Sequence, residues 1–196
     1  MKTRFSLLML LLVLLVVAPA AGAPAPTFNA SLEKARLAYG KQPAASLAAL
    51  RQAVELLWER LPFGLEQARL LEAPPDERGQ YIPRGDRPFK PDETLVIYLE
   101  PVGFKVRRQD GMFDYKLEAD FKLTDAWGHE VGASRRFSQL SGPSFSFPDR
   151  LALVVSYDLL GLTSGDYKVE TTLRDVLGNQ KYTLNTSLRV EGAGTP

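Results

Sequence analysis

The residue types that most often carry chemistry are scarce in this chain. It contains one histidine, His129, and no cysteine. A zinc site built from His and Cys ligands is therefore essentially unavailable, and a cysteine nucleophile is impossible. A Ser-His-Asp arrangement would need His129 as its base with Asp125 nearby, but His129 follows a turn signal and is expected to be solvated. Asp125 and Glu130 lack the spacing of a calcium loop. We predict no catalytic residue, no metal site and no cofactor.

Paired carboxylates are the remaining route to catalysis, because glycoside hydrolases need little else. Asp114, Glu118 and Asp120 occupy alternate positions of one stretch, so as strand residues they share a face. Lys116 and Lys122 alternate with them, which is typical of an ordinary solvated face. A carboxylate-dependent hydrolase using Glu118 or Asp120 is therefore the last of three functional hypotheses.

Exposed aromatic side chains offer a route to binding, since their rings form platforms for ligands. Trp127 falls in a predicted turn and is the candidate ligand-binding residue of a carbohydrate-binding module. Tyr98, Phe145 and Phe147 are expected in the core. A formal net charge of +1 over 196 residues gives no electrostatic attraction to nucleic acid.

Residues 1–20 predict an export signal. Lys2 and Arg4 precede an apolar run over residues 7–18, LLMLLLVLLVVA. A helix of this length spans about 18 Å, short of the ~30 Å hydrocarbon core, so a signal peptide is favoured over an uncleaved membrane anchor.

Cleavage is expected after Ala20, with Gly22 as another option. A second Ala-x-Ala site ends at Ala23, but Pro24 would follow that cut directly and makes a poor substrate. Residues 21–28 then form a flexible tether, and no stable membrane span remains. An exported chain without cysteine must be stable without disulfides, which favours a bacterial periplasmic or secreted protein over an animal one.

Residues 29–62 predict an α-helical hairpin. The first helix is expected to begin at a cap on Asn29 or Ser31 and to end near Tyr39. The second, residues 43–61, has apolar positions spaced by three and four, which is typical of a helix packed against a partner: Leu47, Leu50, Val54, Leu57 and Leu61.

Strand patterns dominate the rest of the chain. Residues 63–93 form a connecting strand and loop, with 63–71 ambiguous between strand and helix. Residues 94–191 contain seven or eight strands without crossover helices. Residues 113–124 alternate strictly between apolar and polar, and Asp110-Gly111 predicts a tight hairpin turn. The fold class we predict is mainly β: an antiparallel immunoglobulin-like β-sandwich preceded by the helical hairpin.

Two strand-and-turn units look alike. The stretch YKLE, residues 115–118, leads to DAWG at 125–128, and YKVE, residues 167–170, leads to DVLG at 175–178. We interpret them as two similar hairpins rather than as a duplicated domain.

Residues 162–169, LTSGDYKV, resemble the L-x-x-G-x-Y signature of bacterial immunoglobulin-like and fibronectin type III-like domains. The resemblance implies that the Tyr167 hydroxyl bonds back to the preceding loop as a tyrosine corner, with Leu162 plugging the core. Residues 81–104 are similar to part of an uncharacterised exported bacterial family, which implies location and fold but no activity.

The first functional hypothesis is a non-catalytic exported binding or structural/assembly protein, soluble in the periplasm or outside the cell after signal removal. Its partner would be another protein or a cell-envelope component. The hairpin would serve as a docking or dimerising element. The alternatives are the carbohydrate-binding module and the hydrolase.

Overall fold

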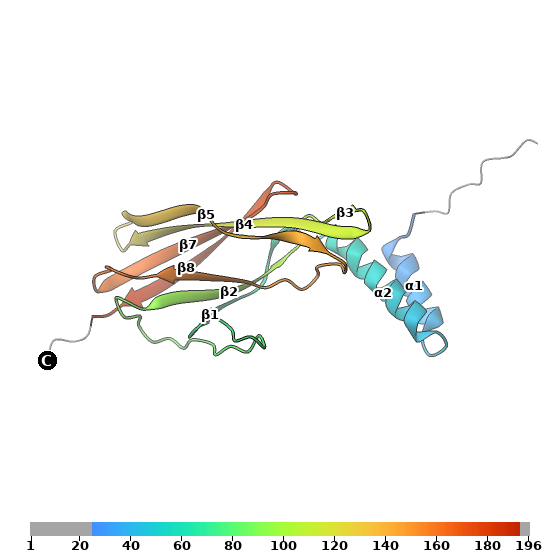
Figure 1. Ribbon diagram of the computed structural model, residues 1–196, viewed down its shortest axis with the longest axis horizontal. Helices are drawn as coiled ribbons and strands as arrows, with labels where there is room; N and C mark the ends of the chain where they lie inside the picture. The colour runs from blue at the N-terminus through green and yellow to red at the C-terminus, as the bar shows by residue number, and fades with distance from the viewer. Residues whose placement is uncertain (1–24, 193–196) are drawn as a thin grey trace, which may run out of the picture.

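The computed structural model describes residues 25–192. In that part of the chain, two helices precede eight strands, which form two antiparallel sheets (Figure 1). The expected class, a mainly β antiparallel sandwich after a helical hairpin, is confirmed. The predicted signal peptide, residues 1–20, lies outside the described residues. None of the described helices has the length and apolar character needed to cross a membrane.

The first sheet contains β1 (Gly64–Leu71), β2 (Thr94–Val102) and β6 (Leu153–Asp158), with β2 in the middle. The ambiguous segment 63–71 forms β1, so the sandwich includes a strand that precedes residue 94. The nearly continuous apolar sequence of β2 predicts burial on both faces. Leu95 and Val96, which point to opposite faces, are both buried.

The loop of residues 72–93 runs along one edge of the sandwich, where Pro83 pairs with β1 and Phe89 with Val190, and covers part of the outer face of this sheet. Tyr81 stacks on Tyr98 of β2, with ring centroids 5.2 Å apart. The buried guanidinium of Arg84 lies 3.6 Å from the centroid of the Phe89 ring. Tyr81 therefore shields part of the side of β2 that points away from the second sheet.

The second sheet is built around β4 (Met112–Asp125). One edge of β4 pairs with β5 (Glu130–Ser144). The other edge pairs first with β3 (Arg107–Gln109) and then with β7 (Gly165–Asp175), which in turn pairs with β8 (Gln180–Val190).

The turn predicted at Asp110-Gly111 joins β3 to β4. Its φ angles are 50° and 80°, the positive values that a two-residue hairpin turn requires. β5 continues to Ser144, which still pairs with Phe113 of β4.

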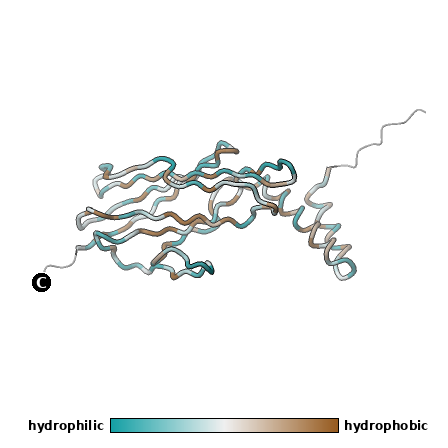
Figure 2. Tube along the Cα trace, viewed as in Figure 1, coloured by the Kyte–Doolittle hydropathy of each residue, from teal (hydrophilic) through white to brown (hydrophobic). Residues whose placement is uncertain are grey.

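The core lies between the two sheets, where the alternating apolar residues of β4 meet those of β2, and Figure 2 shows hydrophobic residues along the strands. Burying each such leucine or valine contributes roughly 1.5–3 kcal/mol. The largest fully buried side chains include Leu95, Ile97, Leu99, Leu117, Val155, Val169 and Leu173.

Two helices, α1 (Phe28–Ala38) and α2 (Pro43–Trp58), form the predicted hairpin. The cap of α1 is Thr27, whose hydroxyl oxygen accepts a first-turn backbone N–H at 3.2 Å. The prediction of a cap at Asn29 or Ser31 is therefore wrong by two to four residues, because both lie inside the helix.

Small side chains form the contact between the helices. Ser31 and Ala35 of α1 are buried against Ser46, Ala49 and Ala53 of α2. The Ser46 hydroxyl donates a hydrogen bond to the Ala35 carbonyl oxygen at 2.9 Å. Small residues let the helix axes approach closely, so the larger residues of α2 lie to one side. The prediction that its apolar stripe packs against a partner is therefore not met by any residue between 25 and 192.

The hairpin projects from one end of the sandwich (Figure 1). Trp58 anchors it: the indole N–H donates to the Phe104 carbonyl oxygen at 2.9 Å. Its ring packs edge-on against Phe104 and Phe147, with centroid distances of 5.1 and 5.6 Å. Gly103 has a φ of 68° and lies so close to Pro62 that a Cβ would overlap the Pro62 carbonyl group. The junction is thus close-packed.

Candidate functional site

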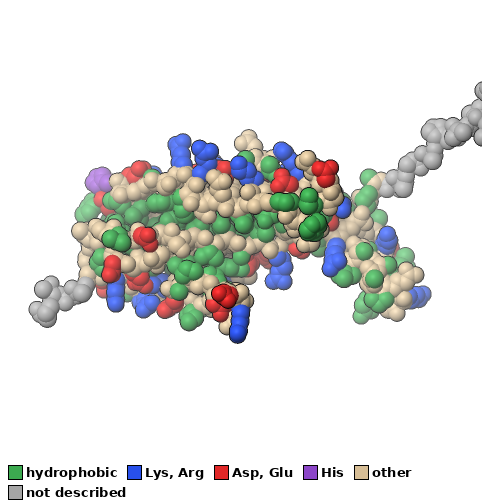
Figure 3. All heavy atoms as spheres, viewed as in Figure 1, with side chains coloured by type: hydrophobic (Ala, Val, Ile, Leu, Met, Phe, Trp, Pro, Cys, Tyr) green, Lys and Arg blue, Asp and Glu red, His purple; other side chains and the backbone are tan. Residues whose placement is uncertain are grey.

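An apolar face runs along the helical hairpin, and Figure 3 shows hydrophobic side chains exposed there. We call it the leucine face. Its members are large apolar residues that remain 37–48% exposed: Leu32, Leu47, Leu50, Val54, Leu57 and Leu61. Sequence reasoning found the α2 stripe but expected a partner to cover it. No described residue does so.

The two helices direct this surface to the same side. In each helix an exposed apolar residue directly follows a buried small one: Leu32 follows Ser31, Leu47 follows Ser46, Leu50 follows Ala49, and Val54 follows Ala53. One residue corresponds to a rotation of about 100°, and equal rotations in an antiparallel pair lead to the same side. Leu37, which is 62% exposed, does not follow a buried small residue, and it points away from the leucine face.

Trp127 lies at the β4–β5 turn and is 83% exposed. The Asp125 carboxylate supports the turn, because its Oδ1 accepts the backbone N–H groups of Trp127 and His129 at 2.9 and 2.8 Å. Its Oδ2 lies 3.0 Å from His129 Nδ1. Burial acts to raise the pKa of Asp125, but the hydrogen bonds outweigh it and hold that pKa below its usual value. The turn therefore exposes the Trp127 ring, and the hydrogen bonds to Asp125 hold the backbone that carries it.

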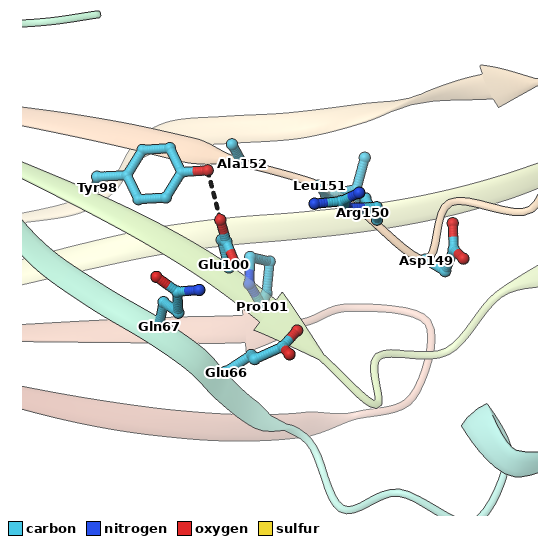
Figure 4. A pocket seen from close by; sticks show the side chains of 9 residues that line it. All are labelled: Glu66, Gln67, Tyr98, Glu100, Pro101, Asp149, Arg150, Leu151 and Ala152. Carbon is cyan, nitrogen blue, oxygen red and sulfur yellow. Dashed lines mark hydrogen bonds between the residues drawn. The ribbon is translucent and has the colours of Figure 1, made fainter. Parts of the chain in front are cut away.

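A pocket of about 550 Å³ lies on the outer face of the first sheet. Figure 4 shows Gln67, Tyr98 and Glu100 on one side of it and Arg150 on the segment that leads to β6. The Tyr98 hydroxyl donates to Glu100 Oε1 at 2.6 Å. This hydrogen bond, followed by burial and by the carboxylate charge, raises the pKa of Tyr98 to about 12. At neutral pH Tyr98 is therefore a hydrogen-bond donor and not a base.

Glu118 and Asp120 of β4 share a cation, Arg174 of β7. Its Nη2 donates to Asp120 Oδ1 at 2.8 Å and lies 3.4 Å from Glu118 Oε2. Lys116 Nζ is 3.5 Å from the other oxygen of Glu118. Glu118 is only 6% exposed, so this face is less solvated than its alternation suggests. Both carboxylates are engaged in ion pairs with Arg174.

Tyr167 lies near the start of β7, where its hydroxyl donates to the Thr163 carbonyl oxygen at 2.9 Å. Its ring is buried, and Leu162 is half-buried against the core. Leu159, in the same loop, is the fully buried residue. These contacts brace the β6–β7 loop and do not form a ligand site.

Sequence reasoning missed the Tyr98–Glu100 pair, because Tyr98 was expected in the core. The signal was present, since residues two apart in a strand share a face and Glu100 marks that face as polar. Phe145 was also expected in the core, yet it is 92% exposed. Phe147 packs edge-on against Phe113, with centroids 5.5 Å apart.

The similarity of this chain to known proteins is low. No family model matches the sequence, and no curated protein matches it. A β-glucuronidase from Bacteroides uniformis has 15% identity over 52% of this chain, with a TM-score of 0.34. A family 123 glycoside hydrolase from Clostridium perfringens has 8% identity over 68% of this chain, with a TM-score of 0.37. The chain spans 12% and 27% of the lengths of those two proteins. Likeness of this degree carries no argument about function.

Proposed function

We propose that this chain is a non-catalytic exported binding or assembly protein, with the sandwich as a rigid body and the helical hairpin as its docking element. The leucine face carries the proposal, because large apolar residues stay exposed on both helices. Contiguous apolar surface of this kind marks interaction sites in water-exposed proteins. The anchored Trp58 would present the face on a stiff arm.

The location we propose is the periplasm or the exterior of a bacterial cell. The supporting features are the positively charged start, the apolar run at residues 7–18 and the absence of cysteine. The proposed partner is another protein or a cell-envelope component rather than nucleic acid. Kinship with bacterial immunoglobulin-like domains is also a proposal, and the Tyr167–Thr163 hydrogen bond supports it.

The test is site-specific photocrosslinking in producing cells. A photoreactive residue at Leu50, on the leucine face, should form a discrete adduct. The same residue at Leu37, exposed but on the other side of the hairpin, should form none. Absence of an adduct at Leu50, or equal adducts at both positions, would overturn the docking function.

The exposed Trp127 ring favours a second candidate, a carbohydrate-binding module. The Asp125 hydrogen bonds hold its turn in one conformation, which lowers the entropy lost on binding. If this candidate is right, glycan-array binding by the purified chain is abolished by Trp127→Ala. Phe145→Ala, which removes another exposed ring, leaves it unchanged.

A further inference from the structure

We propose that the leucine face binds a second copy of this chain, with α2 of one copy antiparallel to α2 of the other. This inference rests on the proposed docking function and names the partner. Three observations carry it: the symmetry of the apolar stripe, the positions of two charged residues beside it, and the mixed charge of the helix.

The apolar stripe is nearly symmetric about Val54, with four members on α2 and the fifth, Leu61, in the turn that follows it. Leu47 lies seven residues before Val54 and Leu61 seven after, while Leu50 lies four before and Leu57 three after. When two such helices run antiparallel about a two-fold axis at Val54, Leu47 meets Leu61 of the other copy and Leu50 meets Leu57. This register gives each residue of the stripe an apolar counterpart to within about one residue, as a self-complementary two-fold interface requires.

The same register pairs opposite charges. Arg51 and Glu55 lie on the side of the stripe away from α1, at about 80° and 120° from its centre if each residue turns the helix by about 100°. In the antiparallel dimer, the positions of Arg51 in one copy and Glu55 in the other differ by about 3 Å along the helix axis. Neither residue has an ion-pair partner among residues 25–192. Because the two-fold axis generates the same contact a second time, the dimer gains two Arg51–Glu55 ion pairs.

The charge on α2 argues against a membrane surface as the occupant. Helices that lie on anionic lipid carry Lys and Arg on their polar face. Within α2 the charged residues are one cation and one anion, Arg51 and Glu55, and Glu59 and Arg60 follow in the same balance. This pattern suits a protein partner of equally mixed charge, which a second copy is.

Two hairpins stacked through their leucine faces form a four-helix bundle in which neighbouring helices are antiparallel. The sandwiches then extend from opposite ends, since each follows the C-terminal end of its own α2. The face is about 24 Å long and two helices of about 10 Å wide, roughly 500 Å² in projection. Specific interfaces bury about 800 Å² of accessible surface on each partner. A face smaller than this predicts a reversible dimer.

Sedimentation velocity tests the inference on the chain from Ala21 onward, which contains every described residue. Over roughly 1–200 µM, the chain should shift from monomer to dimer, as a micromolar dissociation constant predicts. Val54→Arg places two like charges on the two-fold axis and should weaken the dimer at least tenfold. Leu37→Arg, the matched control, should dimerise like the parent. A parent that stays monomeric, or a Val54→Arg variant that dimerises equally well, overturns the inference; circular dichroism confirms that each variant is folded.

Charge exchange tests the antiparallel register. Arg51→Glu and Glu55→Arg each place like charges opposite one another, so each variant alone should dimerise more weakly than the parent. An equal mixture restores both ion pairs and should dimerise more tightly than either variant alone. A mixture no tighter than its components contradicts the register.

The outcomes separate this inference from the function on which it rests. A monomeric purified chain whose Leu50 position crosslinks to a different protein in cells keeps the docking function and overturns the second copy. A monomeric chain without any crosslink overturns both.

Discussion

Asp125 and Asp175 occupy matching turns of the second sheet, the two D-x-x-G sequences at the ends of β4 and β7. Asp175 is fully buried, and its carboxylate accepts the N–H of Lys105 at 2.7 Å and the N–H of Gly178 at 3.0 Å. Asp125 accepts two N–H groups of its own turn. The two sequences are therefore alike because in each an Asp carboxylate accepts at least one backbone N–H group of the turn that ends the strand.

Tyr167 is expected to contribute to stability through both its ring and its hydroxyl. Tyr167→Phe removes the hydrogen bond to Thr163 and should lower the free energy of unfolding by about 1 kcal/mol. Tyr167→Ala also leaves a cavity and should cost roughly 3 kcal/mol or more. Denaturant midpoints measure both changes. Tyr39→Phe, at an exposed position, serves as the control. Unchanged midpoints in both Tyr167 variants would refute the tyrosine corner.

The raised pKa values of two tyrosines predict loss of stability in alkali. The Glu100 hydrogen bond raises the pKa of Tyr98 to about 12, and burial raises that of Tyr157 to about 12. The fold favours the protonated phenols, so their stabilisation is complete below about pH 10 and is lost as the pH rises toward 12. In urea titrations across this range, Tyr98→Phe should show a shallower decline than the parent. Parallel declines would show that Tyr98 is not coupled to folding.

At the scale of elements, the sequence predicted strands better than it predicted what the helices contact. The period of two in residues 113–124 predicts the core-facing side of β4, although Glu118 on the other face is buried as well. The apolar run at 94–100 predicts a strand buried on both faces, as β2 is. The ends of β5 were less predictable, because Ser, Gly and Pro at 141–144 are typical of loops yet remain paired with β4.

The helix contact was mispredicted because periodicity identifies an apolar side without identifying its partner. Alanine and serine at alternate turns indicated a close helix pair equally well, and they form the contact in α1 and α2. The Tyr98 pocket could not be predicted for a different reason. It depends on residues 66–67, 98–101 and 149–152, which only the sheet pairing brings together.

Gly103 is expected to be essential for the junction between hairpin and sandwich. Gly103→Ala adds a Cβ that overlaps Pro62, on top of the strain at its φ of 68°. Gly79→Ala is the matched control, because Gly79 has a φ of 75° with no atom within 4 Å of the added Cβ. The control should lose about 1 kcal/mol through backbone strain, and Gly103→Ala should lose roughly 1–3 kcal/mol more, the cost of forcing an extra carbon into a close-packed site. Equal thermal stability of the two variants would contradict the close packing at the junction.

At the scale of the whole molecule, two parts differ in how they satisfy their apolar surface. The sandwich buries its own between two sheets, with a loop over the outer face of β2. Apart from the anchor Trp58, the hairpin buries small residues and leaves large apolar ones exposed. The proposed docking function explains why the sandwich buries its apolar surface while the hairpin leaves the leucine face exposed.

The absence of cysteine allows this division to be tested directly in cells. Leu50→Cys and Leu37→Cys each introduce a single thiol, on the leucine face and on the opposite side of the hairpin. Labelling with a membrane-impermeant maleimide, after permeabilising the outer membrane, measures how accessible each thiol is. We expect both thiols to react in dilute purified protein, whereas in cells Leu37→Cys should react and Leu50→Cys should be protected. Equal labelling of the two thiols in cells would contradict a docked leucine face, and no labelling of either would contradict export.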